Sequence, residues 1–365
     1  MKNRILWILA LASCPGLLYA QDIEKRLQHI VDSFYQAFPQ TTGIMIHVAS
    51  PDKKISWSYA TGYSDKATRQ QLTADQPVLI ASNTKTYVAA AILKLAELRK
   101  IDINNAIGPV ISERSGVLLQ NDGYDLNAIK IKHLLSHTSG ISDYTEGDYF
   151  DFVNAHRKYR WTRNEQIERT VAITGPLAQP GDTFKYADVN YLLLTEIIEK
   201  ATQKPFYTAI RDLLDYKGLH LNSTWFVDLE KKLAGVKELA HQYWDRYPWD
   251  SYELDPSWDL YGGGGIAATA GDLAVFFQEL FEGAIVHDKE LLELMHTEVL
   301  NGYCLGLKKL TVADLTAYYH GGFWGTDAAY FPAINSSISV FILQKDERDK
   351  GGAICKEVVA VLKQL

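Results

Sequence analysis

Hydrophobic and polar positions alternate in short segments near both ends of the chain. Thr42–Ala49 and Ile55–Thr61 alternate in this way and are rich in β-branched and aromatic residues. The turn Pro51-Asp52-Lys53 between them completes a pattern that is typical of a β-hairpin. A helix is expected to close the chain over Glu347–Leu365. Four more segments with strand character lie near this end, namely Tyr303–Leu310, Leu315–His320, Ala328–Phe331 and Ser337–Leu343.

The middle of the chain, from about residue 100 to 300, has helical periodicity instead. Because strands from both ends must pair, residues 22–80 and 300–365 are expected to form one antiparallel sheet with helices on its faces. The helical region is then an insertion, which gives an α/β fold of the α+β kind. A site is expected in the groove between the sheet and the helical part. The clearest helices are predicted over Ala187–Ala201, Phe206–Leu214, Asp272–Glu282 and Lys289–Thr297.

Composition and the N-terminus extend this picture. Of the 365 residues, 47% are hydrophobic and 22% are charged, so the chain can form one large domain or two closely joined ones. Lys2 and Arg4 are followed by an apolar stretch from Ile5 to about Leu18 and then by Tyr19-Ala20. This layout is typical of a secretory signal peptide over residues 1–20, with the mature domain over 21–365. The protein is therefore expected to be periplasmic or secreted.

The leader has an alternative interpretation. Leu11-Ala12-Ser13-Cys14 resembles the cleavage box of a bacterial lipoprotein, in which Cys14 would be acylated. The apolar run continues past Cys14, which favours the ordinary signal peptide. Elsewhere the sequence has no segment long and apolar enough to cross a bilayer.

Charge and cysteine usage narrow the classes of function. Removal of residues 1–20 takes away two positive charges, so the net charge changes from −7 to −9. An acidic protein without clusters of Lys and Arg is a poor candidate for binding nucleic acid or an anionic membrane. The ten histidines lack the spacing of zinc sites, so no metal and no cofactor are expected. Cys304 and Cys355 can form a disulfide after export or be small core residues.

Ser82-Asn83-Thr84-Lys85 stands at the head of an apolar helical run and is the strongest candidate for chemistry. Residues three apart share a helix face, so Lys85 can reach the Ser82 hydroxyl. The N–H groups and positive dipole at a helix start, together with burial, predict a Lys85 that is easy to deprotonate and can accept the serine proton. The alternative is a serine that caps the helix beside a solvated lysine. A second copy of the spacing, from Ser50 to Lys53, falls in the hairpin turn and is interpreted as a solvated loop.

Two later segments add candidate groups. Tyr186 precedes a predicted helix and can relay protons, and Asp188 follows it, although a helix N-cap is an equally good interpretation of Asp188. His320-Gly321-Gly322-Phe323 ends a predicted strand. Its glycines allow a substrate backbone to lie along the strand edge, and the N–H of Phe323 can complete an oxyanion hole with that of Ser82. The alternative is a glycine bend beside a surface histidine.

These three elements, in this order, resemble the serine β-lactamase and penicillin-recognising D,D-peptidase superfamily. The Tyr-containing second element is similar to that of the class C β-lactamase, D,D-carboxypeptidase and related esterase branch. The resemblance implies a β-lactamase/transpeptidase-like fold. Further segments that carry it are Leu134–Ile141, which reads LLSHTSGI, Tyr191–Leu194 and Gly264–Leu273.

The resemblance also implies roles for individual residues. Ser82 would be the acylated nucleophile, Lys85 its activating partner and Tyr186 the general acid and base. The amides of Ser82 and Phe323 would form the oxyanion hole, and His320 stands where the branch has Lys or His. The remaining implied substrate-binding residues are Asp188, Gly321 and Gly322. We interpret His137, within the LLSHTSG segment, as structural, because a histidine there can tie a turn to the sheet.

Two departures from the pattern bear on the substrate. Asp188 replaces the Asn of the lactamases, and the chain contains no Lys-Thr-Gly segment. An ionised carboxylate only accepts hydrogen bonds, so it cannot donate to the acylamino group of a β-lactam. Asp188 is expected instead to hold Lys85 in place or to bind a substrate ammonium. Dedicated β-lactamase activity is therefore not expected.

The function predicted from these residues is that of an exported, monomeric serine hydrolase that forms an acyl-enzyme with small amides or esters. D-amino-acid peptides and cell-wall fragments are the first expectation and simple esters the second. Two alternatives stay open, a penicillin-binding protein or sensor that is acylated without efficient turnover, and a β-lactamase. The aromatic stretch between Tyr243 and Tyr261 can either wall the cleft or pack as an extended segment.

Overall fold

The computed structural model describes residues 15–365 of the chain. Residues 1–14 of the expected signal peptide, with the alternative lipoprotein residue Cys14, lie outside the described residues. The expected cleavage position after Ala20 falls within the first helix, α1 (Pro15–Ala37). Export therefore stays a prediction from the sequence.

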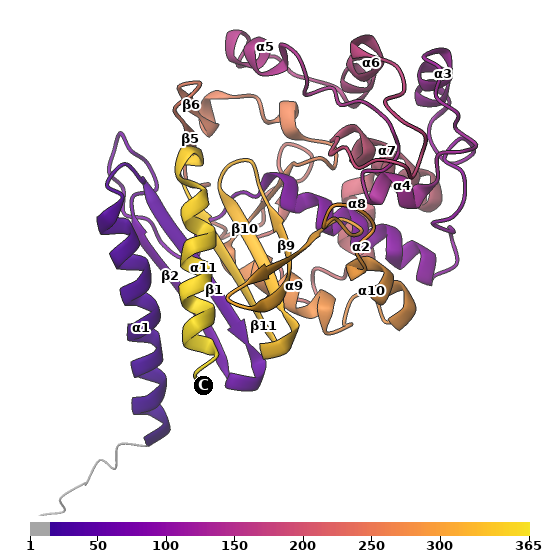
Figure 1. The fold of residues 1–365 in the computed structure, drawn as a ribbon. Helices are drawn as coiled ribbons and strands as arrows, with labels where there is room; N and C mark the ends of the chain where they lie inside the picture. Colours follow the sequence, from indigo (N-terminus) through magenta and orange to yellow (C-terminus); the bar gives the residue numbers. More distant parts are fainter. Residues whose placement is uncertain (1–14) are drawn as a thin grey trace, which may run out of the picture.

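A six-stranded antiparallel sheet is built from both ends of the chain, in the order β2-β1-β11-β10-β9-β8 (Figure 1). The predicted hairpin forms β1 and β2, and β1 pairs with β11 so that Ile44 lies opposite Ile342. The expectation of one sheet from two distant segments is confirmed. The strands are β1 Gly43–Ser50, β2 Ile55–Gly62, β8 Lys308–Val312, β9 Leu315–Gly321, β10 Thr326–Phe331 and β11 Ser336–Ile342.

Helices cover both faces of this sheet. α1 and α11 (Asp349–Leu362) pack side by side on one face, and α9 (Ala270–Phe281) packs on the other. Ile44 and Ile46 of β1 belong to the core under α1 and α11, whereas Met45 between them belongs to the core on the opposite face. Because both faces are covered, every residue of β1 is buried.

A mainly helical region is inserted between β2 and β8, as predicted, and lies to the right of the sheet in Figure 1. The four helices predicted there are present, with bounds that differ by a few residues at most. Its helices besides α9 are α2 Thr84–Glu97, α3 Glu113–Asn121, α4 Ile131–Leu135, α5 Tyr149–Ala155, α6 Arg163–Ile173, α7 Val189–Thr202, α8 Phe206–Leu213 and α10 Lys289–His296. Its short strands are β3 Val78–Leu79, β4 Trp225–Phe226, β5 Tyr243–Trp244, β6 Trp249–Asp250 and β7 Ile266–Ala268.

One strand boundary was predicted wrongly. Strand character was expected from Tyr303, but β8 begins only at Lys308. Gly302 and Gly306 have φ values of +75° and +80°, in the left-handed region that an extended strand cannot contain. The intervening residues are instead buried turns that place Tyr303 beneath β9.

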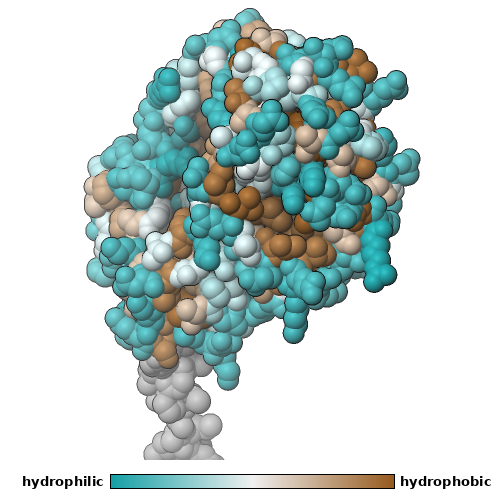
Figure 2. All heavy atoms as spheres, turned by 45° about the vertical axis from the view of Figure 1, so that its right-hand side comes forward, coloured by the Kyte–Doolittle hydropathy of each residue, from teal (hydrophilic) through white to brown (hydrophobic). Residues whose placement is uncertain are grey.

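The remaining sequence expectations concern the two cysteines and membrane-spanning segments. Cys304 and Cys355 are both buried and free, so the core interpretation of these residues holds rather than the disulfide. Among the residues described, no helix combines the length and hydropathy that a membrane span requires. Figure 2 shows a face that is mostly hydrophilic, with hydrophobic residues gathered near its middle.

Candidate active site

Ser82 lies in a 3₁₀ turn, Ala81–Asn83, that joins β3 to α2. Ala81 adopts a φ of +46°, which is unusual for a residue with a side chain and indicates a strained backbone at this turn. The buried amide of Asn83 holds the turn by donating to the carbonyl and hydroxyl oxygens of Thr326 in β10, at 2.9 and 3.1 Å. The turn that carries Ser82 is thus anchored to the central sheet.

Lys85 follows in the first turn of α2 and is completely buried. Its Nζ donates to Ser82 Oγ at 3.0 Å and to the Gly263 carbonyl at 2.5 Å, and lies 2.6 Å from Asp188 Oδ1. Burial lowers the pKa of Lys85, but the negative charges of Asp188, Tyr186 and Asp259 outweigh it and raise this pKa above the usual lysine value. The prediction of an easily deprotonated Lys85 is therefore wrong.

Tyr186 precedes α7 and faces the same amine. Lys85 Nζ lies 4.9 Å from the centre of the Tyr186 ring. Burial raises the pKa of the phenol to about 12, while the charge of Lys85 and hydrogen bonding by Lys85 and Ser82 oppose that rise. The hydroxyl, the amine and the phenol thus converge, as the motifs predicted.

His137 packs against the ring of Tyr186 and binds the backbone that follows it. Its ring centre lies 4.3 Å from that of Tyr186, and its Nδ1 accepts from the Ala187 N–H at 3.2 Å and from the Asn190 amide at 3.1 Å. Because Nδ1 accepts both bonds, the ring is neutral and its proton lies on Nε2. Burial, together with the charge of Lys85, lowers the pKa of His137 well below the usual value. His137 thus has a structural role, but it holds the tyrosine segment rather than a turn against the sheet.

Three carboxyl groups gather beside Lys85. Asp188 forms the ion pair, and its backbone N–H donates to Asp143 Oδ1 at 3.0 Å. Asp143 also accepts from the Thr145 hydroxyl at 2.5 Å. Burial and the charge of Asp188 raise the pKa values of Asp143 and Asp259, and Lys85 partly offsets both increases. Asp188 stands at the N-cap position of α7 without a side-chain capping hydrogen bond, and its carboxylate pairs with Lys85 instead, as one of the two expectations for this residue held.

The end of β9 forms another wall. His320 is buried, with Nδ1–H donating to the Gly321 carbonyl at 3.1 Å and Nε2 accepting from the Tyr303 hydroxyl at 3.2 Å. Burial, then the charge of Lys85, lowers the pKa of His320 to about 3. A neutral imidazole with both nitrogens engaged has no donor left for a substrate carboxylate, so the contacts of His320 do not support the substrate-binding role that the resemblance implied.

The glycines and Phe323 of this wall have separate roles. Gly321 and Phe323 line the same cavity as Ser82, whereas Gly322 packs against the β3 end, where a Cβ would lie 2.3 Å from the Ile80 carbonyl oxygen. Within residues 15–365, the backbone N–H groups of Ser82 and Phe323 donate to no acceptor. Both residues line the cavity, so their free amides are available for the oxyanion hole that the resemblance implied.

The cavity encloses about 320 Å³. One wall is aromatic, with Phe150 and Phe323 stacked at 5.8 Å and Trp258 edge-on to Phe323 at 5.1 Å. Trp258 is the member of the aromatic stretch 243–261 that lines the cavity, so most of this stretch is packing, as the second interpretation held. The lining residues are Ser82, Asp143, Thr145, Phe150, Tyr186, Asp188, Trp258, Asp259, Lys308, Tyr319, His320, Gly321, Phe323 and Arg348.

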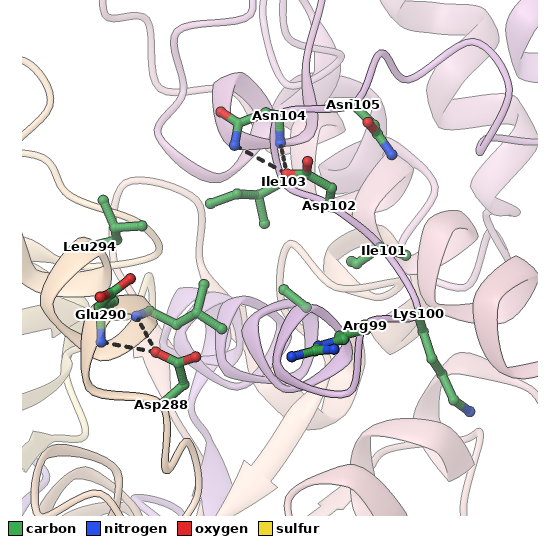
Figure 3. A pocket seen from close by; sticks show the side chains of 12 residues that line it. Arg99, Lys100, Ile101, Asp102, Ile103, Asn104, Asn105, Asp288, Glu290 and Leu294 are labelled. Atoms are coloured by element: carbon green, nitrogen blue, oxygen red, sulfur yellow. Dashed lines mark hydrogen bonds between the residues drawn. The ribbon is translucent and has the colours of Figure 1, made fainter.

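A second hollow of about 570 Å³ lies elsewhere, between the end of α2 and α10 (Figure 3). Asp102 there accepts from Asn104, and Asp288 accepts from the Glu290 N–H at the start of α10. These side chains stabilise turns and a helix end, and Ser82 is not among the residues that line the hollow. The smaller cavity is therefore the candidate active site.

Comparison with known proteins agrees with the motifs. A sequence model described as beta-lactamase matches residues 31–360. The chain belongs to the beta-lactamase family. Among the curated relatives of this chain is Protein flp of Staphylococcus aureus (strain COL), 30% identical over 174 residues, which are 47% of this chain and 32% of that protein. The chain thus matches only about a third of the length of that relative.

Solved structures of other proteins share the fold. D-amino acid amidase from Ochrobactrum anthropi SV3, complexed with L-phenylalanine amide, superposes with a TM-score of 0.79 at 20% identity, covering 94% of this chain and 99% of that one. EstCE1, described as a hydrolase with promiscuous acyltransferase activity, has a TM-score of 0.75 at 19% identity with the same coverage. The β-lactamase/transpeptidase-like fold expected from the sequence is confirmed.

Sequence reasoning missed several cavity residues of this family member. Asp143 follows the LLSHTSG segment closely, and Asp259 precedes the glycine run 262–265, which was interpreted only as a close-packed turn. Gly263 in that run supplies the carbonyl that accepts from Lys85. An acidic residue close to a motif or to a glycine run is the sequence signal that could have identified Asp143 and Asp259. Lys308 and Arg348 carried no comparable signal, because they are brought to the cavity by the fold of the sheet and α11.

Proposed function

We propose that this chain is a serine hydrolase that cleaves small amides or esters through an acyl-enzyme on Ser82. The observation that carries the proposal is the contact of Lys85 Nζ with Ser82 Oγ at 3.0 Å, beside the ring of Tyr186, while Ser82 and Tyr186 line one cavity. Family membership and the amidase and hydrolase folds among the solved neighbours support the same class of reaction. D-aminoacyl amides and peptides are the first substrates to test.

The proposed first step is attack of Ser82 Oγ on the substrate carbonyl carbon. The serine proton passes to the phenolate form of Tyr186, and the new oxyanion accepts from the N–H groups of Ser82 and Phe323. When the tetrahedral intermediate collapses, the C–N or C–O bond breaks and Tyr186 returns the proton to the leaving amine or alcohol. Water then attacks the acyl ester, the acid is released, and the Ser82 hydroxyl is restored.

The roles of Lys85 in this scheme are positional and electrostatic. Its ammonium donates to the Ser82 hydroxyl and the Gly263 carbonyl and forms an ion pair with Asp188. The same positive charge lowers the pKa of Tyr186 against the effect of burial. A protonated Lys85 therefore favours the phenolate that the first step needs, without acting as the base itself.

The test is active-site labelling combined with a hydrolysis panel. A fluorophosphonate probe is expected to label wild-type protein and not Ser82→Ala, as read by mass spectrometry of the intact chain. The panel compares p-nitrophenyl esters, D-aminoacyl anilides, D-Ala-D-Ala peptides and nitrocefin. Turnover of an ester or amide that Ser82→Ala lacks supports the hydrolase. A penicillin adduct that persists without any turnover would contradict the hydrolase and support the sensor. Efficient nitrocefin hydrolysis would support the β-lactamase instead.

A further inference from the structure

We propose that Lys345 is a positioning residue, which holds the ring of Phe323 and, through that ring, the backbone N–H that completes the oxyanion hole. The inference rests on the proposed function and adds to it a side chain from outside the cavity wall. Phe323 lines the cavity with Ser82, whereas Lys345 is not among the lining residues. The lysine is half-buried on the far side of the ring's aromatic cluster.

The contacts of the Lys345 amine are the first argument. Its Nζ lies 4.3 Å from the centre of the Phe323 ring and 3.8 Å from that of Trp244, and these two rings meet edge to face at 5.1 Å. Within residues 15–365 this Nζ has no hydrogen bond and no ion pair. The neighbouring carboxylate of Asp346 accepts instead from the Asp245 N–H at 2.7 Å. The two rings are therefore the partners of the ammonium, and partial burial strengthens such a cation–π contact.

The backbone around Phe323 explains why the position of its ring matters. Phe323 lies in the turn between β9 and β10, which is closed by the Gly322 N–H donating to the Thr326 carbonyl at 2.5 Å and the Gly325 N–H donating to the Gly322 carbonyl at 3.1 Å. Neither bond uses the N–H of Phe323, so packing of the side chain must help to fix the direction of that N–H. Small misplacements of a group that stabilises the transition state cost a large part of the rate.

The segment that carries Lys345 is itself anchored. Lys345 follows β11 closely, and just before it the Leu343 carbonyl accepts from the Tyr243 N–H at 3.0 Å. The side chain of Gln344 accepts from Lys66 Nζ at 2.9 Å. A lysine on a fixed backbone can restrain a ring on the neighbouring turn, so the contact links the end of β11 to the turn that presents the Phe323 N–H.

The contact depends on the charge of the amine, which provides a pH-dependent readout. Burial, together with the charges of Arg348 and Arg246, lowers the pKa of Lys345 to about 8, and the charge of Asp346 opposes this shift. The amine is therefore mostly charged at pH 6.5 and mostly neutral at pH 9.5, so the cation–π attraction is present below the pKa and lost above it. Methionine keeps an unbranched apolar side chain without the charge, whereas arginine stays charged at both pH values.

The kinetic test compares wild type, Lys345→Met and Lys345→Arg on p-nitrophenyl butyrate. At pH 6.5, Lys345→Met is expected to lower kcat about three- to tenfold with little change in KM, and Lys345→Arg to recover most of that loss. At pH 9.5 the kcat values of wild type and Lys345→Met are expected to converge. Lys350→Met is the matched control, because it removes a lysine that lies 4.6 Å from the centre of the Phe38 ring, and neither of these residues lines the cavity.

A double-mutant cycle separates action through the ring from a direct effect of the charge. In the Phe323→Leu background, Lys345→Met is expected to have no further effect on kcat, because the ring through which the lysine acts is absent. A loss of the same size in both backgrounds would overturn the positioning role.

A nuclear magnetic resonance test needs no catalysis. In protein labelled with ¹³C,¹⁵N-phenylalanine, loss of signals in Phe323→Leu identifies those of Phe323. Its ring carbons are expected to titrate with a midpoint near pH 8 in wild type and in neither Lys345 variant, and at pH 6.5 its amide is expected to move in Lys345→Met more than in Lys345→Arg. A ring that does not titrate, with an amide that does not move, would overturn the proposal whether or not esters are hydrolysed. The expected signals without Ser82-dependent labelling would reject only the hydrolase.

Discussion

The Nζ of Lys85 lies 2.6 Å from Oδ1 of Asp188, and the lysine side chain is completely shielded from solvent. This ion pair reverses the expectation for the lysine, because a carboxylate in contact stabilises the ammonium more than burial destabilises it. An asparagine, which the resemblance implied at this position, would not hold the lysine charge in the same way because its amide is neutral. Asp188 therefore stabilises the charged state of the amine beside Ser82.

The first prediction concerns the pH dependence of hydrolysis. Asp188 raises the pKa values of both Lys85 and Tyr186, so Asp188→Asn lowers both. Because Tyr186 accepts the serine proton in the proposed mechanism, the rising alkaline limb of kcat/KM is expected to move to lower pH by on the order of one unit. The measurement uses p-nitrophenyl acetate, a small neutral ester without an amine. An unchanged limb would show that neither group controls this step.

His137 provides the second prediction. His137→Leu leaves the Ala187 N–H and the Asn190 amide without their acceptor, so the free energy of unfolding is expected to fall by about 1–3 kcal/mol. Because the ring also packs on Tyr186, kcat is expected to fall tenfold or more while KM changes little. His137→Asn retains an acceptor near Nδ1 and is expected to recover part of both. Loss of stability with an unaltered kcat would show that His137 stabilises the fold but does not position Tyr186 for catalysis.

The sequence predicted the sheet and the convergence of Ser82, Lys85 and Tyr186 because these depend on local signals. Strand alternation, helical periodicity and three short motifs each lie within a few adjacent residues. The nucleophile turn itself was less visible. Its strained Ala81 and its anchor from Asn83 to Thr326 link segments that are 243 positions apart in the chain.

The charge state of Lys85 could not be predicted for the same reason. Its pKa depends on Asp188, at the start of α7, and on Asp259, just before the glycine run, and its amine also donates to the Gly263 carbonyl. A local argument from the helix dipole and burial includes none of these groups. The internal bonds of His320 were equally hidden, because Tyr303 reaches it through turns that had been predicted as strand.

The third prediction compares two glycines. At Gly322 a Cβ would lie 2.3 Å from the Ile80 carbonyl oxygen, and this backbone directly precedes the Ser82 turn. Gly322→Ala is therefore expected to lower the free energy of unfolding by about 1–3 kcal/mol and to slow fluorophosphonate labelling. Gly352 lies on the exposed side of α11 with nothing within 4 Å of its Cβ position. Gly352→Ala is expected to stabilise by about 0.5–1 kcal/mol with labelling unchanged, and thermal unfolding measures both.

Asp259 gives a prediction about stability and pH that is independent of any substrate. Burial and the charge of Asp188 raise the pKa of this carboxyl in the folded protein, whereas in the unfolded chain it has the ordinary value of about 3.9. Below that value both states bind the proton, and above it the unfolded state loses the proton first, so rising pH destabilises the fold until the folded pKa is reached. Asp259→Asn removes this effect. Its gain in melting temperature over wild type is therefore expected to be larger at pH 8 than at pH 5, as differential scanning calorimetry in matched buffers measures. A gain that shrinks as pH rises would mean that Asp259 is stabilised as a carboxylate in the folded protein, by a partner stronger than Lys85.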